Sequence, residues 1–383
     1  MRHTIRIAFV ILSISVVSSP AFAERVIIKC PASCDPVVAA VQTAGGTVTH
    51  RYKYVKAIAA DVPSAGLNAV RKVAGPASVR KDLMVTTGLS ATDRRSGASL
   101  LVNEQAQAVS SFTAQTLVDT AGARPQAYLI NNATTKVAQL HAAGFVGDQS
   151  VVAVIDSGIR PGYPHLEIDG SVIGGEDFVG DGNGFSNPAN SGHGTFVAGM
   201  ISSNVVFGVS AGLRQAVALE CPACLLSDGS LPVIGSAPFA DIYAVRVLNS
   251  QGSGAISWIL AGMEHVIDLR RAYDAGGAPT PDPVTGKYQA LPIKVANMSL
   301  GGSTLFPGRD IGDEMTNAFL DNDIVLVVAA GNQGPGGATI GSPGSGVSSL
   351  TVGASSSAVH ERILWNLQLG LGAGALVRPF SGT

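Results

Sequence analysis

The chain has 383 residues, of which 46% are hydrophobic and only 14% are charged, and its 46 glycines and 20 prolines indicate many turns. This composition is typical of a folded globular protein and excludes an intrinsically disordered one. The formal net charge is −2, and no stretch of the chain is rich in lysine and arginine. Electrostatic binding to nucleic acid or to an anionic membrane surface is therefore excluded.

Residues 1–23 have the pattern of a secretory signal peptide. Arg2 and Arg6 provide a basic start, an apolar run of 11 residues follows, and Ala21-Phe22-Ala23 provides the small residues that signal peptidase requires. The apolar run is shorter than the roughly 20 residues that cross a bilayer, and no later segment is long and apolar enough to do so. The sequence therefore predicts a secreted protein, either extracellular or periplasmic.

Four cysteines form two close pairs in the sequence, Cys30 with Cys34 and Cys221 with Cys224. In an exported protein, an even number of cysteines in local pairs favours disulfides. A four-cysteine zinc site and a thioredoxin-like redox site are the alternatives. The first needs two pairs that lie about 190 residues apart to meet, and the second needs a strand before Cys221 that the sequence does not provide. We expect two local disulfides.

Residues 24–87 have the pattern of a small, independent α+β domain. The expected order is strand, helix, β-rich stretch, helix and strand, at residues 25–30, 36–45, 46–62, 67–75 and 79–86. This order favours a split β-α-β sandwich with antiparallel strands. Residues 88–125 are polar and aperiodic, and they are expected to be a linker or processing region.

Residues 126–383 alternate between apolar runs and amphipathic segments, as expected of a second, larger domain. The apolar runs are nearly continuous, which is typical of strands buried on both faces; they lie at 151–156, 241–248, 293–300, 324–331 and 348–355. Helices are expected after His193 and over residues 253–277 and 310–322. Strands alternating with helices predict an α/β fold with a parallel sheet.

Two polar residues are placed where such sheets carry their functional sites. Asp156 follows the apolar run Val-Val-Ala-Val-Ile, and His193 lies within Gly-His-Gly-Thr at the expected start of a helix. The helix dipole is expected to lower the pKa of His193 and to favour a neutral imidazole that acts as a base. Each residue alone would be interpreted as structural, Asp156 as a turn cap and His193 as a packed side chain.

Two further segments follow strands at the same expected edge of the sheet. Asn332 lies between glycines after the run 324–331, where its amide would donate to an oxygen that gains charge. Ser299, Leu300 and Gly301 lie at the end of the run 293–300, and their backbone would pair with an extended peptide. The alternative for both segments is an ordinary glycine turn.

Together these motifs resemble those of the subtilisin-like serine protease family. The resemblance rests on Asp156-Ser-Gly, on His193-Gly-Thr-Phe-Val-Ala-Gly, on Tyr243–Leu248, on Asn297–Gly301 and on Ala330-Gly-Asn332, in that family's order. It implies a three-layer α/β catalytic domain and a secreted endopeptidase that acts on proteins or peptides. His193 would be the base, Asp156 would orient it, Asn332 would stabilise the oxyanion, and Ser299–Gly301 would bind substrate. Residues 24–87 resemble, more weakly, the family's inhibitory propeptide, the alternative being an ordinary N-terminal domain.

The resemblance also identifies what the sequence does not provide. The nucleophilic serine of a Gly-Thr-Ser turn is expected after residue 383 and is missing from this chain, so the chain as given is expected to be inactive. A non-catalytic, protease-like protein that binds peptides or inhibits a protease is the alternative function. No cofactor is expected. Calcium is common in the family, and Asp177, Asp181 and Asn183 bring oxygen atoms together, but a polar turn explains them better.

Overall fold

The computed structural model describes residues 23–86, 135–159, 171–186, 192–207, 214–215, 225, 227–334 and 336–354. Residues 1–22 of the expected signal peptide lie outside this range, as do the whole of the expected linker region, the Cys221–Cys224 pair and the last 29 residues. The chain divides into two compact units. The smaller comprises residues up to Arg51 together with Lys56–Lys81, and the larger comprises Tyr52–Val55 and the chain from Asp82 onward.

The smaller unit is a four-stranded antiparallel sheet with two helices. Its elements in chain order are β1 (Ala23–Lys29), α1 (Asp35–Thr43), β2 (Thr47–Arg51), β3 (Ala57–Pro63), α2 (Leu67–Ala74), a 3-10 turn (Pro76–Ser78) and β4 (Val79–Lys81). The strand order is β2-β3-β1-β4, and every pairing is antiparallel. The single closing strand expected at 79–86 is wrong: the chain divides there into β4 and a separate strand, β5 (Met84–Thr86), which belongs to the larger unit.

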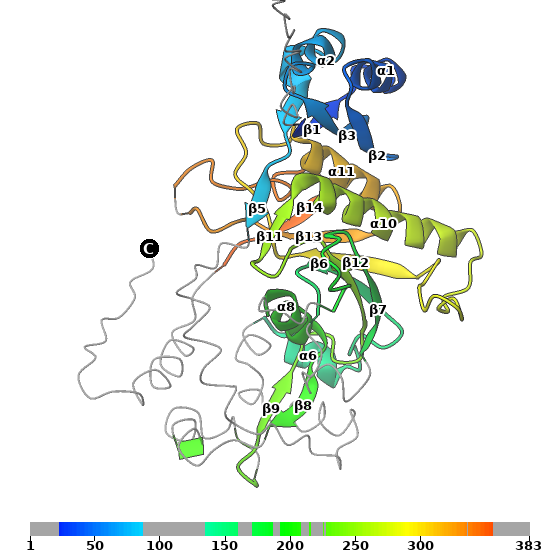
Figure 1. The fold of residues 1–383 in the computed structure, drawn as a ribbon. Coiled ribbons are helices and arrows are strands. Elements are labelled where there is room, and N and C mark those ends of the chain that lie inside the picture. The colour runs from blue at the N-terminus through cyan, green and yellow to red at the C-terminus, as the bar shows by residue number, and fades with distance from the viewer. Residues whose placement is uncertain are drawn as a thin grey trace, which may run out of the picture. The chain divides into compact units, whose positions relative to one another are not determined.

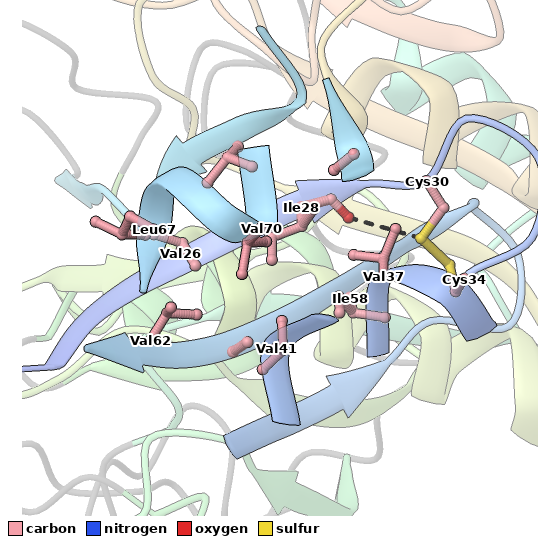
Figure 2. Packing of buried hydrophobic residues seen from close by; sticks show 13 residues of the cluster. Val26, Ile28, Cys30, Cys34, Val37, Val41, Ile58, Val62, Leu67 and Val70 are labelled. Atoms are coloured by element: carbon pink, nitrogen blue, oxygen red, sulfur yellow. Dashed lines mark hydrogen bonds between the residues drawn. A yellow bond between two sulfur atoms is a disulfide. The ribbon is translucent and has the colours of Figure 1, made fainter. Parts of the chain in front are cut away.

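The core of the smaller unit forms because both helices have apolar residues at helical spacing. Val37 and Val41 of α1, and Leu67 and Val70 of α2, are buried against alternate residues of the strands. Figure 2 shows these side chains pointing toward one another, with the disulfide of Cys30 and Cys34 at one end of the cluster.

The larger unit is built on a six-stranded parallel sheet. Its strands are β6 (Val151–Asp156), β7 (Val172–Asp177), β10 (Asp241–Arg246), β12 (Ile293–Met298), β13 (Val325–Ala329) and β14 (Ser349–Val352), in the order β14-β13-β12-β6-β10-β7. The five expected strands are present. β7 was not predicted, because Gly174 and Gly175 interrupt its apolar run. Gly175 is required there, since a Cβ would lie 2.4 Å from the carbonyl oxygen of Ala244.

Helices cover both faces of this sheet, which makes the three layers of an α/β fold (Figure 1). On one face lies α8 (His193–Ser202), and on the other lie α10 (Ile256–Asp274) and α11 (Ile311–Leu320). Val152 and Val154 of β6 pack with Val197 of α8, as the two-residue period of a strand requires. The short α6 (Val137–Ala142) precedes β6. Within the described ranges, no helix is long and apolar enough to cross a membrane.

The described part of the larger unit also contains two small antiparallel pairs of strands. β8 (Asn204–Phe207) pairs with β9 (Leu231–Ile234), and β5 pairs with β11 (Ser253–Ala255). In a parallel sheet the carboxyl ends of all strands lie along one edge. Asp156 ends β6, Ser299 follows β12, and Asn332 follows β13, so the fold places the predicted site residues along a single edge.

Candidate active site

Asp156 and His193 form a direct hydrogen-bonded pair. The imidazole Nδ1 lies 2.8 Å from Oδ1 of Asp156 and 3.0 Å from Oδ2. The carboxylate is completely buried, while 15% of the His193 side chain is exposed. Because the carboxylate accepts the Nδ1 proton, Nε2 is the ring nitrogen that remains to accept a proton from another group.

The turn after β6 holds this pair in place. The backbone N–H of Ser157 donates to Oδ1 of Asp156 over 2.6 Å, and the buried Ser157 hydroxyl accepts the N–H of Gly194 over 3.0 Å. Gly194 directly follows His193, and a Cβ on it would lie 2.4 Å from the carbonyl oxygen of Gly158. The glycine therefore allows the first turn of α8 to approach the Asp156 turn, and the Ser157 hydroxyl links the two halves of the pair.

The pKa of His193 is raised above its ordinary value. Burial of the ring lowers the pKa, but the hydrogen bond to Asp156 and the charge of that carboxylate together raise it more. The expectation that the helix dipole would give a lowered pKa is therefore wrong. A buried carboxylate in contact with the ring outweighs the partial charge of a helix terminus.

The segment Ser299–Gly301 lies beside a second loop of the larger unit. The Asn297 side-chain amide donates to the Ser299 hydroxyl over 3.0 Å, and Leu300 is buried. Gly302 and Ser342 exchange backbone hydrogen bonds of 2.9 Å in each direction. This pairing holds the residue that directly follows Ser299–Gly301 against the loop that carries Ser342.

Asn332 lies in an exposed turn after β13. Gly331 has a positive φ of 105°, which favours glycine, and the Asn332 backbone N–H donates to the side chain of Gln333 over 3.0 Å. No hydrogen bond joins Asn332 to Asp156 or His193 among the contacts of the described residues. The structure thus brings Asp156 and His193 into contact and places Asn332 and Ser299–Gly301 on the same edge of the sheet.

The acidic side chains of the oxygen-rich segment 177–183, the possible calcium site, contact an arginine side chain. The Arg246 guanidinium donates to both carboxylate oxygens of Asp181 over 2.7 Å and to the carbonyl oxygen of Gly184 over 3.1 Å. The hydrogen bond from Arg246 holds the pKa of Asp181 well below its ordinary value. Asn183 contributes its backbone N–H to Asp181 rather than a side-chain oxygen. Throughout the described part of the chain, no group of three or more His, Cys, Asp or Glu side chains could hold a metal ion.

Three residues of this region were not identified as functional from the sequence. Ser157 and Gly194 lie next to the predicted residues, and only the fold shows that their backbone and hydroxyl groups join the pair. The sequence does contain a signal for Arg246, because a cation within the apolar run 241–248 needs a buried anionic partner.

The sequence profile described as the Subtilase family matches residues 147–375, more than half of the chain. The chain belongs to the subtilase family. The match covers every strand of the parallel sheet as well as Asp156, His193 and Asn332. The recognition of a subtilisin-like serine protease family and of an α/β fold is confirmed.

Individual subtilases are similar to this one over much of its length. Subtilisin E of Bacillus subtilis (strain 168) is 30% identical over 317 residues, which are 82% of this chain and 59% of subtilisin E. A subtilisin of Bacillus pumilus is 34% identical over 227 residues, 58% of this chain and 62% of that protein. Serine protease AprX of Bacillus subtilis (strain 168) is 35% identical over 212 residues, 54% of this chain and 38% of AprX. The chain therefore spans less than two thirds of the length of each of these relatives.

Proposed function

We propose that this subtilase is a secreted serine endopeptidase that cleaves proteins or peptides. The observation that carries the proposal is the buried Asp156 carboxylate bonded to Nδ1 of His193, which leaves Nε2 as the base. In this proposal Nε2 takes the proton of the nucleophilic serine hydroxyl as its oxygen attacks the peptide carbonyl. Asp156 stays ionised and stabilises the imidazolium, which then protonates the leaving amine.

Asn332 is proposed to bind the oxyanion of the tetrahedral intermediate. Its position after β13, at the edge that carries Asp156, supports this role, and its exposure leaves the side-chain amide accessible to a substrate. The proposal requires a nucleophilic serine as well. The sequence to Thr383 contains no Gly-Thr-Ser turn that would provide one.

The short strand β5 supports a substrate cleft beside Ser299–Gly301. Met84–Thr86 pairs antiparallel with Ser253–Ala255 of β11, and the Val85 side chain lies so close to Gly302 that a Cβ there would approach it to 3.3 Å. β5 is thus an extended segment that lies between β11 and Gly302. A bound peptide would lie there in the same extended conformation. We therefore propose that residues 24–87 are a propeptide whose last residues occupy the cleft and inhibit the enzyme until they are cleaved off.

The same observation favours a second function if no serine is supplied. A protein with this cleft and without a nucleophile would bind extended peptides and release them uncleaved. The two functions differ in one result, namely whether a peptide bond is broken when a peptide enters the cleft.

The test begins with the coding sequence downstream of Thr383. If the open frame continues through a Gly-Thr-Ser turn, the protein encoded by the full frame is produced and its hydrolysis of casein and of short peptides is measured. The proposal predicts hydrolysis that is lost in a Ser→Ala variant of that turn and in His193→Ala. Binding of peptides without hydrolysis, with both variants binding equally well, would establish the second function instead.

A further inference from the structure

The last residue of β10, Arg246, is a completely buried cation. Its guanidinium makes a two-pronged contact with Asp181, with both N···O distances at 2.7 Å, and lies 3.4 Å from a carboxylate oxygen of Asp177. A planar, bidentate contact of this kind fixes orientation as well as charge, because the two parallel hydrogen bonds allow one geometry only.

The backbone of Arg246 lies between the strand of the catalytic pair and the strand of its acidic partners. In the sheet register it is opposite Asp156 of β6 on one side and Asp177 of β7 on the other. The next residue, Val247, donates its N–H to the carbonyl oxygen of Asp156 over 2.8 Å, and the Arg246 carbonyl accepts the N–H of Phe178 over 2.9 Å. Backbone hydrogen bonds therefore join Arg246 and Val247 to the end of β6 and to the residue that follows β7.

The side chain of Arg246 also lies against the turn that follows Asp156. A Cβ on Gly158 would lie 3.2 Å from Cδ of Arg246 and 2.2 Å from the carbonyl oxygen of Phe185. The same Phe185 carbonyl accepts the N–H of Ile159 over 3.1 Å. The loop that Arg246 holds through Asp181 thus contacts, through Phe185, Gly158 and Ile159 of the turn that follows Asp156.

We propose that Arg246 is a positioning residue for the Asp156–His193 pair, acting through the loop 177–185 and the turn 156–159. The effect of Arg246 on catalysis depends on the function proposed above. The guanidinium lies between the carboxylates of Asp177 and Asp181 and neutralises their mutual repulsion, so that the loop keeps one conformation against the turn.

Stability alone explains this buried cation poorly. A buried ion pair gains little over apolar residues of similar volume, because both ions lose their hydration. Within the described residues, the buried Nε of Arg246 has no hydrogen-bond partner. Arg246 adds little stability but fixes the geometry of the turn 156–159. Its burial is better explained by a role in holding that turn, which orients the Asp156 carboxylate.

The test uses NMR of the 383-residue chain, with two signals of His193 as readouts. One is the pH titration of its imidazole carbons, and the other is the downfield Nδ1 proton shared with Asp156. Arg246→Lys retains the positive charge and removes the two-pronged contact, whereas Asp181→Asn retains the arginine and weakens its anchor. Arg270→Met is the matched control, since Arg270 pairs with Asp274 over 2.8 Å on α10 and has only 11% of its side chain exposed.

In Arg246→Lys and Asp181→Asn we expect the pKa of His193 to fall toward its ordinary value and the downfield proton to broaden or disappear. Arg270→Met should unfold at a lower temperature and leave both signals unchanged. If the full reading frame encodes the proposed enzyme, Arg246→Lys should lower its kcat at least tenfold with little change in KM, because the substrate cleft is untouched.

The proposal is overturned if Arg246→Lys and Asp181→Asn leave both His193 signals as in the parent. It is also overturned if Arg270→Met changes them equally, because the effect would then be a general loosening. Asp181→Asn changes a partly exposed residue, so at least one variant is expected to fold. If Asp156→Asn by itself does not alter the His193 titration, the catalytic pair itself is refuted. This outcome is distinct from the outcomes for Arg246→Lys, Asp181→Asn and Arg270→Met.

Discussion

The two halves of the candidate site are built in different ways. The half that would move protons is buried: Asp156 is completely inaccessible, and Ser157 and Gly194 connect it to His193 by backbone and hydroxyl hydrogen bonds. The half that would bind substrate, Ser299–Gly301 and Asn332, lies in loops, and Asn332 is exposed. A base needs one fixed geometry, whereas a peptide needs an open edge to enter. Changes in the first half should therefore affect both stability and activity, and changes in the second half should affect activity alone.

The largest expected effect is the loss of the pair itself. If the full reading frame encodes the proposed enzyme, His193→Ala and Asp156→Asn should reduce its kcat by about 10⁴-fold to 10⁶-fold, the range that removal of a triad member causes in subtilisin. Steady-state hydrolysis of a peptide measures this loss. Asp282→Asn, which changes a carboxylate in an exposed turn, is the matched control and should retain full activity. Activity that survives in His193→Ala would exclude His193 as the base.

The second prediction concerns the open half of the site. Asn332→Ala should lower kcat by about 10²-fold to 10³-fold, the usual result of removing one oxyanion donor, and leave KM nearly unchanged. Because Asn332 is exposed, the free energy of unfolding should change by less than about 0.5 kcal/mol. Urea unfolding of the variant is the companion measurement. A large loss of stability would show that Asn332 belongs to the packed half and would break the comparison.

The smallest effect is expected at the link within the buried half. Ser157→Ala removes the hydroxyl that accepts the Gly194 N–H and leaves that donor buried without its partner. The cost should be about 1–3 kcal/mol in the free energy of unfolding. Ser186→Ala, at a serine in the partly exposed turn beyond Phe185, serves as the control. Equal stability of the parent and of Ser157→Ala would indicate that the turn is held by the backbone alone.

Much of this organisation could be predicted from the sequence, and the exceptions have physical reasons. Five strands of the parallel sheet were predicted because they are nearly continuous apolar runs. β7 was missed because Gly174 and Gly175, which make room for close packing, also hide the run. The positions of Asp156 and His193 followed from strand-end and helix-start patterns. The direction of the His193 pKa shift did not, because it depends on a contact between residues 37 positions apart.

The role of Arg246 shows where sequence patterns stop being informative. Its position within an apolar run predicts a buried partner but does not say which of the nearby carboxylates it is. In the sequence, Asp177, Asp181 and Asn183 bring oxygen atoms close together, and a polar turn explains them better than a calcium site. In the fold, a guanidinium that comes from 65 residues further along the chain lies against the same oxygens.

The pH dependence of the Asp156–His193 pair tests the central claim. Because the pKa of His193 is raised in the folded protein, the pair stabilises the fold fully below the ordinary histidine pKa of about 6.5, and this contribution is lost as the pH rises through the raised pKa. Catalysis has the opposite requirement: it needs the neutral ring, so kcat/KM should fall as the pH falls through the same pKa.

The most direct measurement is the NMR titration of His193 in the 383-residue chain and in Asp156→Asn. The account predicts a pKa above the ordinary histidine value in the parent and a clear fall in the variant, since burial alone lowers the pKa once the carboxylate charge is gone. A pKa that is the same in both proteins would show that Asp156 does not act on His193, and the catalytic assignment of the pair would then be wrong.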